Sequence, residues 1–162
     1  MELKEKGRLK GIFRLRKFEN DQALKEDRTY FDEIIGENLM MNAGINLMLT
    51  LLAGGAGTVY SNANSYLGVG DSSTAAAATQ TTLQAATNKA YAAMNSGYPT
   101  YGTSQQIVFQ SNFGSSVANY AWNEMAVFNG NGTGTMLDRL VSSQGTKTSG
   151  QTWQLTLTIT ES

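Results

Sequence analysis

Several short segments of the chain alternate hydrophobic and polar residues, which is the pattern of a β-strand with one buried face. In the segment QTWQLTLTIT at residues 151–160, large apolar side chains take one side, and glutamine or threonine takes the other. The Asn-Gly pair at residues 129–130 predicts a hairpin turn, because both residue types tolerate a positive φ. Strands are predicted in this part of the chain at residues 64–70, 89–94, 105–113, 119–128, 135–141 and 151–160.

The first 37 residues predict a further pair of strands. Residues 8–18 place Phe13 and Leu15 on one side and mostly basic residues on the other, with Ile12 as the exception. Residues 28–35 form the second predicted strand, and a polar loop joins the two. If these strands pair, a basic strand faces an acidic one, and each opposite-charge pair contributes about 0.2–1 kcal/mol.

One helix is predicted between Gly36 and Gly54, near residues 42–53. Apolar residues recur there in steps of about four, and Gly54 provides a stop because glycine enters the left-handed conformation without steric cost. A helix this apolar is expected to be mostly buried. The alanine- and threonine-rich residues 74–94 predict a surface loop with one helical turn around residues 80–85, followed by a strand; one long helix is the alternative.

These elements together predict a mainly β protein. The expected fold is an antiparallel β-sandwich or a jelly-roll-like barrel of about 7–8 strands, with one short helix. Two parts are expected along the chain: a charged N-terminal arm or β-hairpin at residues 1–37, and a β-sandwich body at residues 38–162.

Charge is concentrated in the first part. Of the 25 charged side chains, 18 lie in residues 1–37. Residues 1–18 hold seven basic and two acidic residues, a net charge of +5, whereas residues 19–37 hold two basic and seven acidic residues, a net charge of −5. A charge-striped segment beside a body with few charges is suited to docking on another protein. The residues expected to bind a partner are Arg8, Lys10, Arg14, Arg16 and Lys17; the alternative is a solvated hairpin with no partner.

The composition excludes several classes of function. The chain has no cysteine and no histidine, so it lacks disulfides, thiolate sites, the usual general base near neutral pH and the commonest transition-metal ligand. We therefore expect no enzyme activity and no cofactor or metal. The formal net charge of −1 favours neither nucleic acid nor an anionic membrane as a partner. The longest apolar run, residues 45–53, is too short to span a membrane, and the charged beginning does not resemble a secretory signal, so synthesis in the cytoplasm is expected.

Glu124 is the most informative of the isolated carboxylates in the body. It shares a strand face with Trp122 and Phe128, and a carboxylate on a buried face requires a partner. Arg139 lies across the predicted hairpin. We therefore expect Glu124 and Arg139 to form a structural ion pair rather than a catalytic site.

Five segments taken in order resemble a recurrent family of tailed-bacteriophage virion proteins. They are GRLKGIFRLR, NLMMNAGINLMLTLLAGG, SYLGVGDSSTAAAATQTTLQAA, NEMAVFNGNGTGTMLDRLV and TWQLTLTIT, and they cover most of the chain. The matching positions are residues 42–44, 68–75, 82–83, 124–128 and 134–139. The chain departs from the family in the alanine-rich stretch after Ser73, where prolines are frequent in the family.

The resemblance implies a structural subunit of the virion. It is similar to capsid decoration (cement) proteins, which would place it on the head surface with the major capsid protein or another virion protein as partner and a homo-oligomer, with a trimer favoured. A tail, baseplate or fibre-adaptor subunit is the alternative. A more remote alternative is a carbohydrate-binding β-sandwich that uses Trp122 and Trp153 as stacking platforms. The alternation around Trp153 instead places that side chain in the core.

Overall fold

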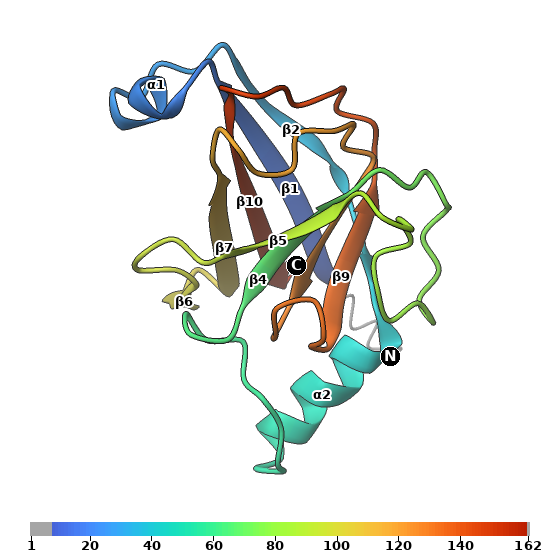
Figure 1. Cartoon of the computed structure of the whole chain (residues 1–162). Helices are drawn as coiled ribbons and strands as arrows, with labels where there is room; N and C mark the ends of the chain where they lie inside the picture. Colours follow the sequence, from blue (N-terminus) through green and yellow to red (C-terminus); the bar gives the residue numbers. More distant parts are fainter. Residues whose placement is uncertain (1–7, 162) are drawn as a thin grey trace, which may run out of the picture.

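The computed structural model describes residues 8–161, which form two five-stranded antiparallel sheets packed as a sandwich (Figure 1). Two helices, α1 (Asp21–Lys25) and α2 (Asn42–Leu52), accompany the sheets. The first sheet has the order β2 (Phe31–Glu37), β1 (Leu9–Phe18), β10 (Thr152–Glu161), β7 (Gln106–Phe113) and β6 (Thr100–Thr103). The second has the order β3 (Leu39–Met40), β9 (Met136–Val141), β8 (Glu124–Phe128), β4 (Tyr66–Gly70) and β5 (Lys89–Ala93).

The alternation of residue types determines which face of the first sheet is buried. Strand β10 pairs with β1 on one side and β7 on the other, with Leu157 opposite both Phe13 and Phe109. These three side chains are completely buried between the sheets. Their sequence neighbours point to the opposite face, so the outer side of this sheet carries threonine, glutamine and arginine. Ile12, which broke the predicted alternation, lies on that outer side.

The core between the sheets is centred on aromatic residues. Trp122 and Trp153 lie edge to face with ring centroids 4.8 Å apart, and Phe113 contacts Trp122 at the same distance. Both tryptophans are buried, which the alternation around Trp153 predicted for that residue. Burial of large aromatic side chains is a main source of stability in a domain of this size.

A second, smaller apolar cluster lies outside the sandwich core. The loop between β4 and β5, residues 71–88, is called the covering loop because it folds over the outer face of the second sheet. Its Leu83 is buried there with residues of other elements. The cluster consists of Met41, Leu83, Ala126, Phe128 and Met136, with Tyr91 packed against it.

Several sequence predictions differ from the structure in detail. Residues 8–161 contain ten strands rather than 7–8, because the short strands β3 and β6 were not predicted. The two sheets are not joined into a closed barrel, so the sandwich is the correct alternative. The covering loop has no helical turn, and the predicted strand at residues 119–128 begins only at Glu124. The predicted polar loop after β1 contains α1, which Asn20 caps by accepting a hydrogen bond from the Ala23 amide at 2.8 Å.

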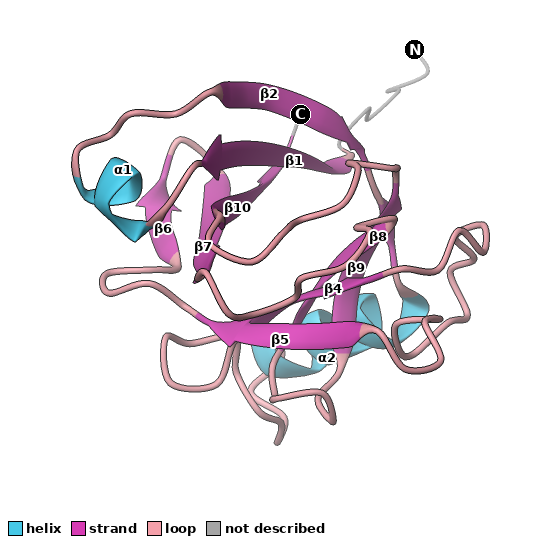
Figure 2. Cartoon of the chain, turned by 45° about the horizontal axis from the view of Figure 1, so that its top comes forward, coloured by secondary structure: helices cyan, strands magenta, loops and turns pink. Residues whose placement is uncertain are grey.

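The predicted N-terminal hairpin forms, and it is built into the first sheet. β1 pairs with β2, as predicted, and also with β10 along its whole length. Figure 2 shows β1 within the layer formed by β2, β10 and β7. Phe13, Leu15 and Phe18 of β1 are completely buried. Residues 9–37 therefore belong to the same sandwich as the rest of the described chain.

Candidate functional site

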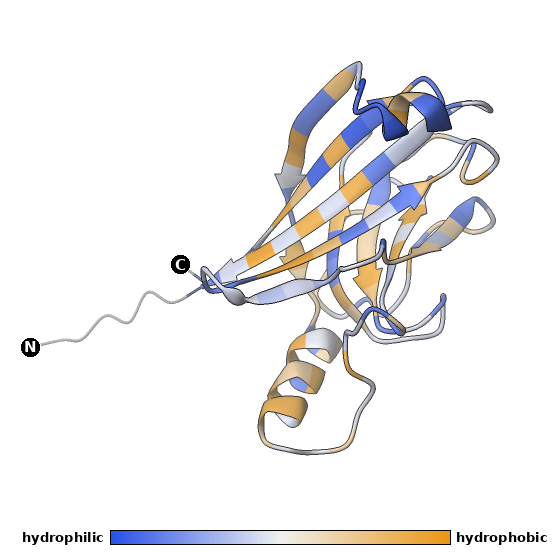
Figure 3. Cartoon of the chain, turned by 90° about the vertical axis from the view of Figure 1, so that its left-hand side faces the viewer, coloured by the Kyte–Doolittle hydropathy of each residue, from blue (hydrophilic) through white to orange (hydrophobic). Residues whose placement is uncertain are grey.

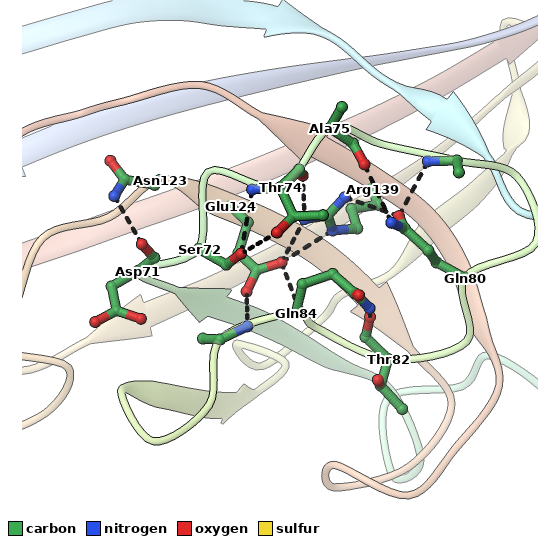
Figure 4. Close-up of polar contacts among 12 residues, drawn as sticks. Asp71, Ser72, Thr74, Ala75, Gln80, Thr82, Gln84, Asn123, Glu124 and Arg139 are labelled. Atoms are coloured by element: carbon green, nitrogen blue, oxygen red, sulfur yellow. Dashed lines mark hydrogen bonds and ion pairs between the residues drawn. The ribbon is translucent and has the colours of Figure 1, made fainter.

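The predicted ion pair between Glu124 and Arg139 is present beneath the covering loop (Figure 4). Both side chains are completely buried, and Arg139 Nη2 lies 2.8 Å from Glu124 Oε2. Arg139 Nε donates to the same oxygen at 2.9 Å. The backbone amides of Gln84 and Ala85 donate to the two carboxylate oxygens at 2.9 and 2.7 Å. The carboxylate is thus compensated by one cation and two amides.

Arg139 and a glycine complete this buried network. Arg139 Nη1 donates to Gln80 Oε1 at 2.8 Å, and Nη2 donates to the Thr74 carbonyl at 2.9 Å. A Cβ atom on Gly70 would lie 2.5 Å from Glu124 Oε1, so only glycine leaves room for the carboxylate at the end of β4. The network holds a loop without regular secondary structure against the second sheet.

The basic residues of β1 are paired largely within the chain. Arg14 makes a bidentate contact with Asp32 of β2, with Nε to Oδ1 at 2.6 Å and Nη2 to Oδ2 at 2.7 Å. Arg16 Nη2 donates to Asp27 Oδ1 at 2.5 Å. The hydrogen bond from Arg14 lowers the pKa of the Asp32 carboxyl below its usual value. Exposed pairs of this kind contribute about 0.2–1 kcal/mol each.

Lys17 is partly buried between aromatic side chains. Its Nζ lies 4.3 Å from the ring centroids of both Phe31 and Trp153 and donates to the Gln144 carbonyl at 2.7 Å. Partial burial lowers the pKa of Lys17, and the nearby Glu33 carboxylate opposes that shift. These contacts give Lys17 a structural role at the end of β1 that is followed by α1.

Lys10 and Arg8 lie at the other end of β1. Lys10 Nζ is 2.6 Å from Glu37 Oε1 in an exposed ion pair, and Arg8 is exposed just before the strand. The predicted cationic surface is therefore divided, since Lys10, Arg14 and Arg16 are matched to acidic residues of the same chain. These three basic residues therefore present ion pairs, rather than a purely cationic surface, to a partner.

The outer face of the first sheet contains a shallow hollow of about 720 Å³. Arg14 and Arg16 border it together with Asp32, and threonines of β10 form part of its floor. The floor and rim mix hydroxyl, amide, charged and apolar groups. The remaining lining residues are Ile12, Asp27, Ile34, Tyr98, Val108, Gln110, Gln154, Thr156 and Thr158.

A buried carboxyl that the sequence did not single out lies inside the sandwich at Asp138. Neither of its oxygens has a hydrogen-bond partner among the described residues, and the same is true of Asn38 Nδ2. A Cβ atom on Gly11 would lie 1.8 Å from Asn38 Nδ2 and 2.3 Å from Asp138 Oδ2, so glycine creates the space for both groups. Burial raises the pKa of Asp138 well above its usual value. Its signal in the sequence was weak, because Asp138 stands beside the more prominent Arg139.

Helix α2 is far less buried than its composition predicted. Gly44 is its only buried residue, whereas Leu49 and Leu52 have exposed fractions of 53% and 84%. The helix projects beyond the two sheets, and its apolar residues are prominent in Figure 3. Beside it, an apolar groove of about 530 Å³ opens at the end of the sandwich. The prediction of a mostly buried helix was therefore wrong for this chain in isolation.

The structure also bears on three other possibilities: sugar stacking on tryptophan, metal binding and a membrane-spanning helix. Trp122 and Trp153 are both buried, so neither offers an exposed platform on which a sugar could stack. Among residues 8–161, no group of three or more histidine, cysteine, aspartate or glutamate side chains is placed to hold a metal ion. No helix in this part of the chain is long and apolar enough to cross a membrane.

Comparisons with known proteins found no matching family model, no matching curated protein and no matching solved structure.

Proposed function

We propose that this chain is a non-enzymatic structural subunit of a tailed-bacteriophage virion, and that it decorates the outside of the head. The proposal rests on the resemblance of five sequence segments to that protein family. It identifies the major capsid protein, or another virion protein, as the partner.

The observation that supports the resemblance most strongly is where its quoted segments lie in the fold. Gly70, Thr74, Leu83, Glu124 and Arg139 come from quoted segments that are separated by up to about half of the chain. They meet in the buried network and in the apolar cluster beneath the covering loop. Short motifs that contact one another in the folded chain depend on that fold, whereas motifs scattered over the surface do not. Their contact therefore supports a resemblance based on these motifs.

The outer face of the first sheet is the proposed contact with the head. It is stiffened by long strand pairing, and its hollow offers both signs of charge together with hydroxyl and amide groups. Mixed polar surfaces of this kind suit interfaces in which each subunit binds modestly and many copies act together. Binding to the assembled head alone would stabilise the head by mass action.

The location of the protein on native particles tests the proposed function. We expect an even distribution over the head and a copy number that follows the capsid lattice. A few copies at the tail would replace the decoration role with the tail role. Absence of the protein from purified particles would refute both roles.

A charge swap tests the proposed face. The double variant Arg14→Asp/Asp32→Arg keeps one internal ion pair and exchanges the positions of its two charges, but it also replaces the 3.3 Å contact between Arg16 and Asp32 with a like-charge contact. We expect the variant to unfold within about 2 kcal/mol of the wild type, because surface ion pairs contribute only about 0.2–1 kcal/mol each, and to bind isolated heads more weakly. The control is Val117→Thr, in a loop at a distance from this hollow. Unchanged head binding by the swapped variant would remove this face from the proposal.

A further inference from the structure

Helix α2 is anchored to β9 at its beginning and projects beyond the sheets at its end. The Met41 amide donates to the Leu137 carbonyl at 2.9 Å, just before the helix starts. A Cβ atom on Gly44 would lie 2.4 Å from Leu137 Cα, so glycine allows the first turn to touch the backbone of β9. Beyond this turn the helix leaves the sheets, and Leu49 and Leu52 face solvent. We call these two side chains the α2 ridge.

The groove lies directly beside the ridge. Met48 and Leu51 of the same helix form part of its wall, and the turn between β6 and β7 forms another part. Its lining includes Leu9, Phe109 and Ile159 of the first sheet, Leu137 of the second sheet, and Tyr60 of the loop before β4. None of the described residues that line the groove is charged. The ridge and one wall of the groove therefore lie on the same helix at one end of the molecule, and polar residues around the turn between β6 and β7 complete the lining.

The charge of the surrounding chain restricts what can cover this surface. Residues 38–70, which contain the whole of α2 and the segment after it, include no charged residue. Charged residues of the described chain border the groove, where Arg8, Lys10 and Glu37 line an adjoining hollow together with Leu9 and Met40. A partner that placed a carboxylate or an ammonium group in the groove itself would bury it without a counter-charge among the described lining residues, at a cost of several kcal/mol. Complementarity therefore requires an occupant that is apolar and uncharged. Monomeric proteins rarely leave apolar patches of this kind uncovered.

A second copy of this chain meets that requirement, because the same surface contains both an apolar ridge and a groove that can receive one. Each copy carries a protruding apolar ridge and, beside it, an apolar groove. In a closed symmetric assembly, the ridge of one copy enters the groove of a neighbour while its own groove receives another ridge. Neither the two leucines of the ridge nor the described lining of the groove carries a charge, and every copy uses both features.

We propose that the α2 ridge and the adjacent groove form the contact between copies of this chain. The contact rests on the proposed virion role only for its setting, because self-association is a property of the purified chain. The proposal also gives two surfaces of the fold different partners. The outer face of the first sheet contacts the head, and the α2 end contacts neighbouring subunits.

Sedimentation velocity of the full chain over a range of concentrations tests the contact. The wild type is expected to form a discrete oligomer, whereas Leu52→Glu, at a position that is 84% exposed, should fold normally and associate about tenfold or more weakly. Leu49→Glu should act in the same direction. The matched control is Val117→Glu, which adds the same charge at an exposed position that lines neither the groove nor the hollow of the first sheet, and it should associate as the wild type does.

Three results would overturn the proposed contact. These are a wild type that remains monomeric at all concentrations, an oligomer that Leu52→Glu leaves intact, and a monomer that carries a bound apolar small molecule in native mass spectrometry. Head attachment, measured separately, distinguishes this outcome from failure of the virion role. Loss of association in Leu52→Glu with no head binding by any variant would support the contact and refute the decoration role.

Discussion

Replacing Arg139 with methionine should destabilise the protein by about 3 kcal/mol. The change removes the only cation among residues 8–161 that contacts the Glu124 carboxylate, and it leaves that carboxylate buried. Breaking a buried ion pair in this way typically costs about 3–5 kcal/mol. We expect the lower end of the range, because the amides of Gln84 and Ala85 still donate to Glu124. For a domain of this length, about 3 kcal/mol corresponds to a fall in Tm of about 6–12 °C.

A double-mutant cycle separates the ion pair from the rest of the network. Glu124→Gln should also destabilise the fold, because it leaves the Arg139 guanidinium buried without its counter-charge. In the double variant Glu124→Gln/Arg139→Met neither charge remains, so its loss of stability should be smaller than the sum of the single losses by about 2 kcal/mol. Urea unfolding followed by the fluorescence of the two buried tryptophans measures all four proteins. Hydrogen exchange should show earlier opening at Gln84 and Ala85 in the single variants.

The control for this cycle is the exposed pair between Arg14 and Asp32. Arg14→Met should cost only about 0.2–1 kcal/mol, because water stabilises the carboxylate that remains. A coupling energy below about 0.5 kcal/mol between Glu124 and Arg139 would refute the reasoning. Equal losses in Arg139→Met and Arg14→Met would refute it as well.

Two further predictions concern the space inside the sandwich at Gly11. Asp138→Asn should stabilise the protein at neutral pH. Burial raises the pKa of the folded carboxyl, whereas the unfolded carboxyl ionises near pH 4, so wild-type stability falls as the pH rises above about 4, by about 1.4 kcal/mol for each unit of pKa shift. Urea unfolding at pH 3.5 and pH 7.5 should show the gain mainly at the higher pH, and a constant difference would contradict it. Gly11→Ala should cost about 1–3 kcal/mol in the same assay, because its Cβ would overlap Asn38 and Asp138. Gly114→Ala, whose Cβ would meet only Asp21 at 3.8 Å, is the control, and an equal effect of the two changes would show that crowding is not the cause.

Local patterns in the sequence were sufficient for the long strands. In β10 the alternation of apolar and polar residues extends along the whole strand, so it identified both the strand and its buried face. The turn after β8 was also predictable, because Asn129 and the glycines that follow it belong to a favoured hairpin sequence. The hairpin between β6 and β7 was missed because Ser104 and Gln105 occupy the positive-φ positions, and neither residue type is typical there.

The candidate sites were predictable only where two residues could be matched from local register. Glu124 and Arg139 lie on adjacent strands joined by a recognisable turn, so their pairing followed from the sequence. The contacts of Arg139 with Thr74 and Gln80 did not, because a loop without periodicity contains no information on where it folds back. Asp138 was missed for a similar reason, because its neighbours are Gly11 of β1 and Asn38 of the link between β2 and β3, which are distant in the sequence.

The sequence by itself determined the class of the fold, the hairpin of opposite charges at the N-terminal end, and the presence of one apolar helix. Each of these follows from the spacing of residue types within a short segment. Only the tertiary structure decided that β1 is an interior strand of the first sheet, and that its charges are matched within the chain. It also decided that α2 projects from the sandwich instead of entering the core. The physical reason is that local spacing records which side of a segment avoids water, whereas the neighbour that covers that side is chosen by contacts between distant parts of the chain, or between copies of it.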